Sequence, residues 1–187
     1  NILEKIIAQK KLEIAALDAV TLRHATEQSP APRDFLAAIK RRRFGLRPSL
    51  IAELKRASPS KGILAPHLDL FQVADIYTQN GASAISVLTD EKLFQGKLET
   101  LRQLRITNHQ LPLLRKDFII DESQIYEARA NGADAILLIA AALPDDKHFA
   151  DLHACAQSLG LTALVEVHDE AETERSLKIP NIQLIGI

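Results

Sequence analysis

The sequence predicts an α/β protein with a parallel sheet, and within that class a (β/α)8 barrel rather than an open doubly wound sheet. Three observations support this prediction: short apolar runs alternate with amphipathic stretches, one helix-to-strand joint occurs twice, and charged residues end alternate apolar runs. Apolar strands that alternate with helices are typical of a parallel sheet covered by helices. Charged groups on alternate strands favour the barrel, because alternate strands contribute to the same interior layer.

The composition fits one globular domain. The chain has 187 residues, of which 47% are hydrophobic and 25% charged, so a packed core is expected. The chain has 23 Lys and Arg residues against 24 Asp and Glu, so it lacks the basic excess that is typical of a nucleic-acid-binding module. The single Cys cannot form an internal disulfide and fits a reducing compartment. No apolar run approaches the roughly 18 residues of a membrane span, so we expect a cytoplasmic protein without membrane or nucleic-acid partners.

Residues 1–48 are expected to form an N-terminal helical extension. Apolar residues recur at helical spacing over Ile2–Leu17, and this stretch contains no Pro or Gly. Two prolines then interrupt the chain, and Asp34 is suited to capping a second short helix that continues through Ile39.

Residues 49–187 are expected to form barrel units one to six, each a strand followed by a helix. The predicted strands are Leu50–Leu54, Ala84–Leu88, Leu111–Leu114, Ala135–Ile139, Thr162–Val167 and Gln183–Ile187. The predicted helices between them are Leu70–Asn80, Leu98–Ile106, Glu122–Asn131, Asp145–Leu159 and Glu170–Leu177.

An internal repeat supports this organisation. The segment Asn80–Ile85 is echoed by Asn131–Ile136, and in both a Gly at the end of a helix is followed directly by a buried strand. Gly81 and Gly132 are suited to the left-handed position that ends a helix. The first strand-to-helix turn lacks the G-x-G-x-x-G pattern, which disfavours a dinucleotide site.

Four charged residues on odd-numbered strands predict a site. Glu53 and Lys55 lie at alternate positions of the first strand and therefore share a face, while Lys116 ends the third run and Glu166 the fifth. Chemistry in such barrels occurs at the carboxyl ends of the strands. One such residue is most simply a solvated loop residue, but four that converge indicate an active site.

Four segments, in order along the chain, resemble the signatures of the indole-3-glycerol-phosphate synthase family. They are Ile51–Gly62, Ala84–Gly96, Leu114–Asp121 and Leu164–Val167. The resemblance covers essentially the whole chain. It implies a TIM barrel preceded by helices that cover part of the substrate.

The resemblance also implies an activity. The family converts 1-(2-carboxyphenylamino)-1-deoxyribulose 5-phosphate to indole-3-glycerol phosphate in tryptophan biosynthesis, releases carbon dioxide and water, and uses no metal or organic cofactor. Ring closure requires the substrate carbonyl to accept a proton, and the resemblance assigns that proton to Lys116. Lys55 would bind the substrate carboxylate and act as the acid in dehydration. Glu166 and Glu53 are the candidate bases and cation stabilisers, with the individual steps left open between them.

The substrate-binding residues follow from the same resemblance. Ser58 corresponds to a position near the substrate phosphate, although a turn residue before a proline is an equally simple interpretation. Phe94 and Phe118 correspond to apolar residues that hold the aromatic ring, and Leu137 on the fourth strand is expected to line the same pocket. Either phenylalanine could instead belong to the core.

Other histidines and the cysteine have simpler interpretations. His153 and Cys155 lie two residues apart on a helix and diverge, so they cannot chelate one metal, and no metal site is predicted. His168 follows Glu166 by two residues, and an exposed loop histidine is its simplest interpretation.

Two alternative functions remain open from the sequence. The first is a barrel aldolase that uses Lys116 as a Schiff-base nucleophile, and the second is a non-catalytic barrel fragment. Family members continue past Ile187 with two further β/α units, so we expect a barrel truncated after the sixth strand or a part of a longer chain. The expected partners are a small phosphorylated aromatic substrate and other tryptophan-pathway enzymes.

Overall fold

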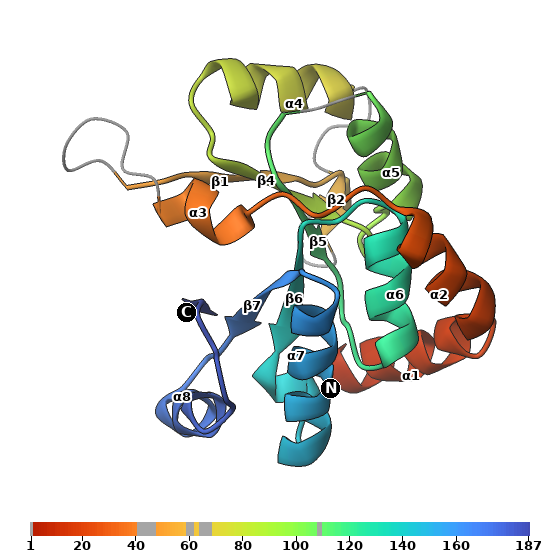
Figure 1. The fold of residues 1–187 in the computed structure, drawn as a ribbon, viewed down its shortest axis with the longest axis vertical. Helices are drawn as coiled ribbons and strands as arrows, with labels where there is room; N and C mark the ends of the chain where they lie inside the picture. Colours follow the sequence, from red (N-terminus) through yellow and green to blue (C-terminus); the bar gives the residue numbers. More distant parts are fainter. Residues whose placement is uncertain (1, 41–47, 59–61, 64–68, 108–109) are drawn as a thin grey trace.

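The computed structural model describes residues 2–40, 48–58, 62–63, 69–107 and 110–187 (Figure 1). Within these residues, a parallel sheet of six strands has the order β1-β4-β5-β6-β7-β8. The strands are β1 (Ile51–Leu54), β4 (Ala84–Leu88), β5 (Leu113–Lys116), β6 (Ala135–Ile139), β7 (Thr162–Glu166) and β8 (Ile185–Gly186). A doubly wound sheet reverses its strand order at a switch point, whereas this order follows the chain. The structure is therefore a partial (β/α) barrel, as predicted.

Helices cover the outer face of the sheet. They are α4 (Leu70–Gln79), α5 (Leu98–Ile106), α6 (Glu122–Ala130), α7 (Asp146–Ser158) and α8 (Glu170–Leu177), with a short 3-10 helix, η1 (Ala140–Ala142), after β6. Figure 1 shows these α-helices following one another around the outside of the curved sheet. Four of them begin at an Asp whose side chain accepts backbone N–H groups of the first turn, which satisfies donors that have no partner inside the helix: Asp69, Asp121, Asp145 and Asp169.

The third strand lies two residues later than predicted. The apolar run Leu111–Leu114 was expected to form it, but β5 covers Leu113–Lys116. Pro112 precedes the strand, and a proline has no N–H to donate to a strand ladder. The shift makes Lys116 the last residue of β5.

The extension contains a helix that the sequence analysis missed. Its helices are α1 (Ile2–Ile14), α2 (Ala19–Gln28) and α3 (Phe35–Lys40), and the prediction lacked α2 and extended the first helix to Leu17. Asp18 starts α2 by accepting the backbone N–H groups of Val20 and Thr21. The helix packs on α6, where the Thr26 hydroxyl donates to the carbonyl oxygen of Tyr126 at 3.1 Å. Its β-branched residues are weak helix formers, so tertiary contacts stabilise it.

A short antiparallel hairpin was also not predicted. It consists of β2 (Ala57–Ser58) and β3 (Gly62–Ile63), and it lies in the connection between β1 and α4.

The core divides between the two faces of the sheet. On the outer face, alternate strand residues such as Leu54, Val87 and Ile136 pack against the covering helices. On the inner face, Phe35 of α3 is fully buried in a cluster near the amino ends of the strands, with Ala84, Leu114 and Ala135. A second inner cluster, nearer the carboxyl ends, contains Leu137, Ile139 and Ala142, and residues Leu3 and Ile7 of α1 pack against it. The extension therefore contacts both ends of the inner face.

The repeated helix-to-strand joint has the predicted geometry. Gly81 and Gly132 have φ angles of +89° and +87°, a region that favours glycine. In both joints the residue just before the strand donates its N–H to a carbonyl oxygen at the start of the neighbouring strand: Ser83 to Leu50, just before β1, at 2.8 Å, and Asp134 to Leu113 of β5 at 2.9 Å.

Candidate active site

The strand registers place the predicted charged residues on the inner face. The registers of β1 with β4 and of β4 with β5 align Glu53 with Leu114, a member of the inner cluster. Lys116 lies two residues beyond Leu114 on the same strand and therefore shares its face. Glu166 is paired with Ile139, which also lies on the inner face. Lys116 and Glu166 are the last residues of β5 and β7 and therefore lie at the carboxyl edge of the sheet, and Glu53 is the residue before the last of β1.

The charged side chains form two ion pairs at this edge. The Lys55 Nζ lies 2.8 Å from the Glu53 Oε1, and the Lys116 Nζ lies 3.6 Å from the Glu166 Oε2. Each of the four side chains is between 28 and 34% exposed, so a ligand can reach them while they are partly shielded from water. The second pair joins strands that are not neighbours, because β6 lies between β5 and β7.

The predicted apolar residues lie on or after β5, the strand that ends at Lys116, and its two neighbours β4 and β6. Phe94 follows β4 and Phe118 follows β5, and their ring centroids lie 6.2 Å apart at an interplanar angle of 34°. Both rings are partly buried. Leu137 is 2% exposed, and Phe118 packs against its cluster. Ser58 belongs to β2, next to residues outside the described part of the chain, and its expected phosphate contact stays a prediction.

His168 lies beside the predicted site. Its Nε2 is 3.5 Å from the Glu166 Oε1, and its Nδ1 is 3.4 Å from the Glu172 Oε2. The imidazole is 59% exposed, as the simpler interpretation expected, but it contacts the second oxygen of the carboxylate that also contacts Lys116. The sequence signal for this contact was the position of His168 two residues after Glu166.

Sequence reasoning missed a buried group of charges behind the site. The Lys10 Nζ lies 2.9 Å from the Asp90 Oδ2 and 2.8 Å from the Asp117 Oδ1. Burial opposes the charge of Lys10, but Asp117 and the other carboxylates outweigh it and raise the pKa of the ammonium. Burial also opposes the charge of Asp117, but Arg115 and Lys10 hold the pKa of its carboxyl below its ordinary value. Lys10 and Asp117 are therefore both charged at neutral pH in the folded protein.

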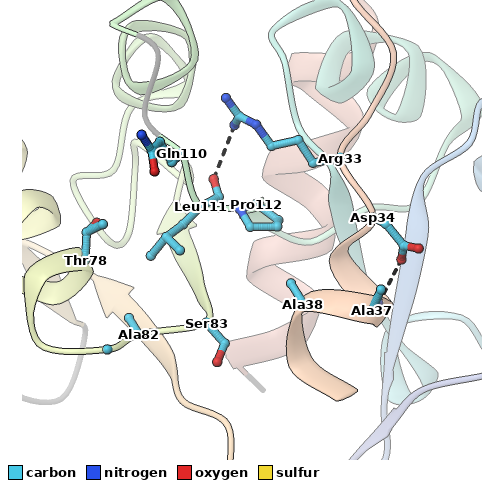
Figure 2. Close-up of a pocket in the computed structure, with 11 residues that line it drawn as sticks. Arg33, Asp34, Ala37, Ala38, Thr78, Ala82, Ser83, Gln110, Leu111 and Pro112 are labelled. Carbon is cyan, nitrogen blue, oxygen red and sulfur yellow. Dashed lines mark hydrogen bonds between the residues drawn. The ribbon is translucent and has the colours of Figure 1, made fainter. Parts of the chain in front are cut away.

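A hollow of about 600 Å³ lies near the amino edge of the sheet (Figure 2). Ser83 and Pro112, which line it, each come just before a strand. Figure 2 shows Arg33 donating to the Leu111 carbonyl, at 3.2 Å, and Asp34 accepting the backbone N–H of Ala37, at 2.8 Å. These polar groups serve the local structure, and barrel chemistry occurs at the opposite edge, so we do not assign the active site to this hollow.

The described residues contain no group of three or more His, Cys, Asp or Glu side chains arranged to hold a metal ion. Burial lowers the pKa of His153 and raises the pKa of the Cys155 thiol to about 11. Cys155 is therefore a protonated, unreactive thiol at neutral pH. Among the helices that the structure describes, none has the length and apolarity needed to cross a membrane.

The fold and the lysine–carboxylate pairs at the carboxyl edge define an enzyme of the (β/α)-barrel class. The model of the family named Indole-3-glycerol phosphate synthase matches residues 3–187. The chain belongs to the indole-3-glycerol phosphate synthase family, whose members are decarboxylating lyases of tryptophan biosynthesis. This membership confirms the function expected from the resemblance and disfavours the Schiff-base aldolase.

Individual relatives agree with this assignment. The chain is 48% identical over 193 residues to the indole-3-glycerol phosphate synthase of Polaromonas naphthalenivorans, and the match covers 100% of this chain and 72% of the relative. It is 46% identical over 193 residues to the chloroplastic enzyme of Arabidopsis thaliana, covering 100% of this chain and 48% of that relative. Among solved structures, 3-keto-L-gulonate-6-phosphate decarboxylase from Vibrio cholerae matches with a TM-score of 0.55 and 18% identity, over 72% of this chain and 59% of that one. That likeness supports the fold alone.

Proposed function

We propose that Lys116 is the general acid of ring closure on the phosphorylated aromatic substrate of this family. As the ring carbon attacks the substrate carbonyl, the carbonyl oxygen gains a proton, and an ammonium group at the carboxyl edge can supply it. The observation that carries the proposal is the contact between Lys116 and Glu166, at 3.6 Å, on the inner face. Glu166 restrains the direction of the lysine chain, and the partial exposure of both groups leaves room for substrate.

Lys55 is the proposed ligand of the substrate carboxylate and the acid of the dehydration step. In the free protein its ammonium is bound to Glu53 at 2.8 Å. A substrate carboxylate can replace Glu53 at that position at little electrostatic cost, because one anion replaces another. Glu53 is then free to accept a proton or to stabilise developing positive charge, and Glu166 can do the same at the other pair.

Phe94, Phe118 and Leu137 are the proposed binding surface for the aromatic part of the substrate, and Ser58 the proposed phosphate ligand. The tilted ring pair and the buried Leu137, against whose cluster Phe118 packs, support this role because they lie on or after β5, the strand of Lys116, and its neighbours β4 and β6. Aromatic rings favour such offset or tilted neighbours.

We place the protein in the cytoplasm, with other tryptophan-pathway enzymes as candidate partners and without nucleic-acid or membrane partners. The near-neutral charge and the single Cys support this placement. The same proposal divides the chain into the helical extension at residues 1–48 and the barrel units at residues 49–187.

The decisive experiment follows the fluorescence of the indole product in the complete protein supplied with 1-(2-carboxyphenylamino)-1-deoxyribulose 5-phosphate. We expect turnover with release of carbon dioxide. Borohydride added during turnover should leave Lys116 unmodified by mass spectrometry. Absence of product, or a reduced adduct on Lys116, would overturn the proposal and favour the non-catalytic or the Schiff-base alternative respectively.

A further inference from the structure

Three buried charged residues connect the N-terminal extension to two loops of the barrel. Lys10 lies on α1, Asp90 follows β4 and Asp117 follows β5, and their side chains are 3%, 0% and 2% exposed. We call these residues the buried triad. The Lys10 ammonium lies within 2.9 Å of both carboxylates, so one cation holds the two loops at a fixed separation.

Each carboxylate of the buried triad also holds the backbone of an aromatic residue of the proposed site. The Asp90 Oδ1 accepts the N–H groups of Leu93 at 2.9 Å and Phe94 at 3.3 Å. The Asp117 Oδ1 accepts the N–H of Phe118 at 2.8 Å, and the same oxygen contacts Lys10. The two rings that these backbones carry form the tilted pair described above.

The phenylalanines depend on these contacts more than Lys116 does. Lys116 lies within β5 and is paired with Leu88 of β4, so the sheet itself fixes its backbone. Phe94 and Phe118 lie beyond the ends of β4 and β5, where no strand ladder restrains them. Loss of the link between the loops therefore changes the aromatic pair first.

A gain in folding stability is a weak explanation for the presence of the buried triad. Buried ion pairs lose much of their attraction to desolvation, and apolar replacements of whole pairs are often neutral or stabilising. Their best-attested benefit is a fixed geometry.

We propose that Lys10 is a positioning residue that sets the spacing of Phe94 and Phe118 and thereby the fit of the substrate's aromatic ring. This inference rests on the proposed role of the two phenylalanines. It gives the N-terminal extension a specific contribution to substrate affinity that acts from behind the site, through the two aspartates.

The test replaces Lys10 with Met in the complete protein, which removes the ammonium and keeps the chain length. We expect KM for the substrate to rise about tenfold while kcat stays within about threefold, because ring binding is weakened and the acid stays in place. The matched control is Lys5→Met, an exposed position of the same helix, which should leave both constants unchanged. An unchanged KM in Lys10→Met, or an equal change in the control, would overturn the proposal.

Lys10→Met leaves Asp90 buried without its cation, so a second variant separates stability from positioning. In Lys10→Met/Asp90→Asn the uncompensated charge is gone, the Asn oxygen can still accept from Leu93 and Phe94, and Asp117 keeps Arg115 at 3.2 Å. We expect the melting temperature to recover while KM stays raised. If the double variant regained both the melting temperature and the KM of the unmodified protein, Lys10 would have a structural role alone, which would contradict the proposal.

Amide hydrogen exchange gives a readout that needs no turnover. The amides of Phe94 and Phe118 keep their acceptors in Lys10→Met/Asp90→Asn, but they should exchange faster than in the unmodified protein, because the two loops open more often without the cation between them. Amides within β5 should keep their protection. Unchanged exchange at both phenylalanines would reject the positioning role whatever the kinetics show. If exchange changes but the unmodified protein has no turnover, the positioning inference stands and the proposed function fails.

Discussion

The Lys116 ammonium lies 3.6 Å from the Glu166 carboxylate, although these residues end strands that are separated by β6. Two long side chains therefore span the inner face of the sheet toward each other. The contact brings a proton donor and a proton acceptor to one place, and its geometry depends on the curvature of the sheet.

Replacing Lys116 with Ala should reduce kcat by about 10² to 10⁴, the usual range for loss of a general acid. Substrate binding should change little, because the proposed carboxylate and ring contacts belong to other residues. Product fluorescence gives the rate, and isothermal titration calorimetry with the substrate gives the affinity. Lys178→Ala, at an exposed lysine after α8, is the matched control. Turnover of Lys116→Ala within tenfold of the unmodified enzyme would contradict the assignment.

Replacing His168 with Ala should lower kcat/KM by about threefold. The imidazole contacts one oxygen of Glu166 at 3.5 Å, but it is 59% exposed, and contacts of solvent-exposed side chains are weak. The comparison is His24→Ala, another exposed histidine, which lies on α2. A loss near 10³-fold would instead show that His168 takes part in proton transfer itself.

The two glycines of the repeated joint should differ in their tolerance of alanine. Both have positive φ, so either substitution should cost about 1 kcal/mol or more of unfolding free energy. A Cβ at Gly81 would meet no atom within 4 Å, whereas a Cβ at Gly132 would overlap the Arg105 side chain. Since Arg105 binds the buried Asp134 at 3.1 Å, Gly132→Ala should cost roughly 1–3 kcal/mol more than Gly81→Ala. Urea unfolding of the two variants measures the difference, and equal costs would show that Arg105 moves freely.

His153 should make stability depend on pH on the acidic side of neutrality. Burial lowers its pKa below the ordinary value of about 6.5, so the unfolded chain takes up the proton at higher pH than the folded protein. Its contribution is therefore present above about pH 6.5 and is lost as the pH falls through the folded pKa. His153→Leu should show a smaller decrease in unfolding free energy between about pH 7 and pH 5 than the unmodified protein or His24→Leu, measured by denaturant titration. An identical pH dependence in His153→Leu would contradict this.

The strands and the charged residues on them were predictable because a strand has a simple geometry. Buried strands appear as apolar runs, and the side-chain period of two settles which residues share a face. That period placed Glu53, Lys116 and Glu166 on one face, and Lys55, just after β1, contacts Glu53. The repeated tripeptide Asn-Gly-Ala, at residues 80–82 and 131–133, is a second local signal, and it correctly located both helix-to-strand joints.

The contacts that the sequence did not predict join segments that are far apart along the chain. Lys10 meets Asp90 and Asp117 only because α1 crosses the ends of two strands, and no local pattern encodes that crossing. Helix α2 was missed because its β-branched residues are weak helix formers, and the contacts that stabilise it on α6 are distant along the chain, as from Thr26 to Tyr126. His168 lies just after a strand, where the period of two no longer fixes the direction of a side chain.

The sequential strand order has a consequence for how the chain folds. Each strand of the sheet pairs with the strand before it in the chain, so the loops closed in building the wall are short and cost little entropy. The extension is different, because its hydrogen bonds join residues 100 and 101 positions apart, from Thr26 to Tyr126 and from Arg33 to Asp134. Contacts between distant residues form slowly. We therefore expect the parallel sheet to assemble first and the N-terminal extension to dock last. The contacts of the buried triad would then form in the final stage of folding.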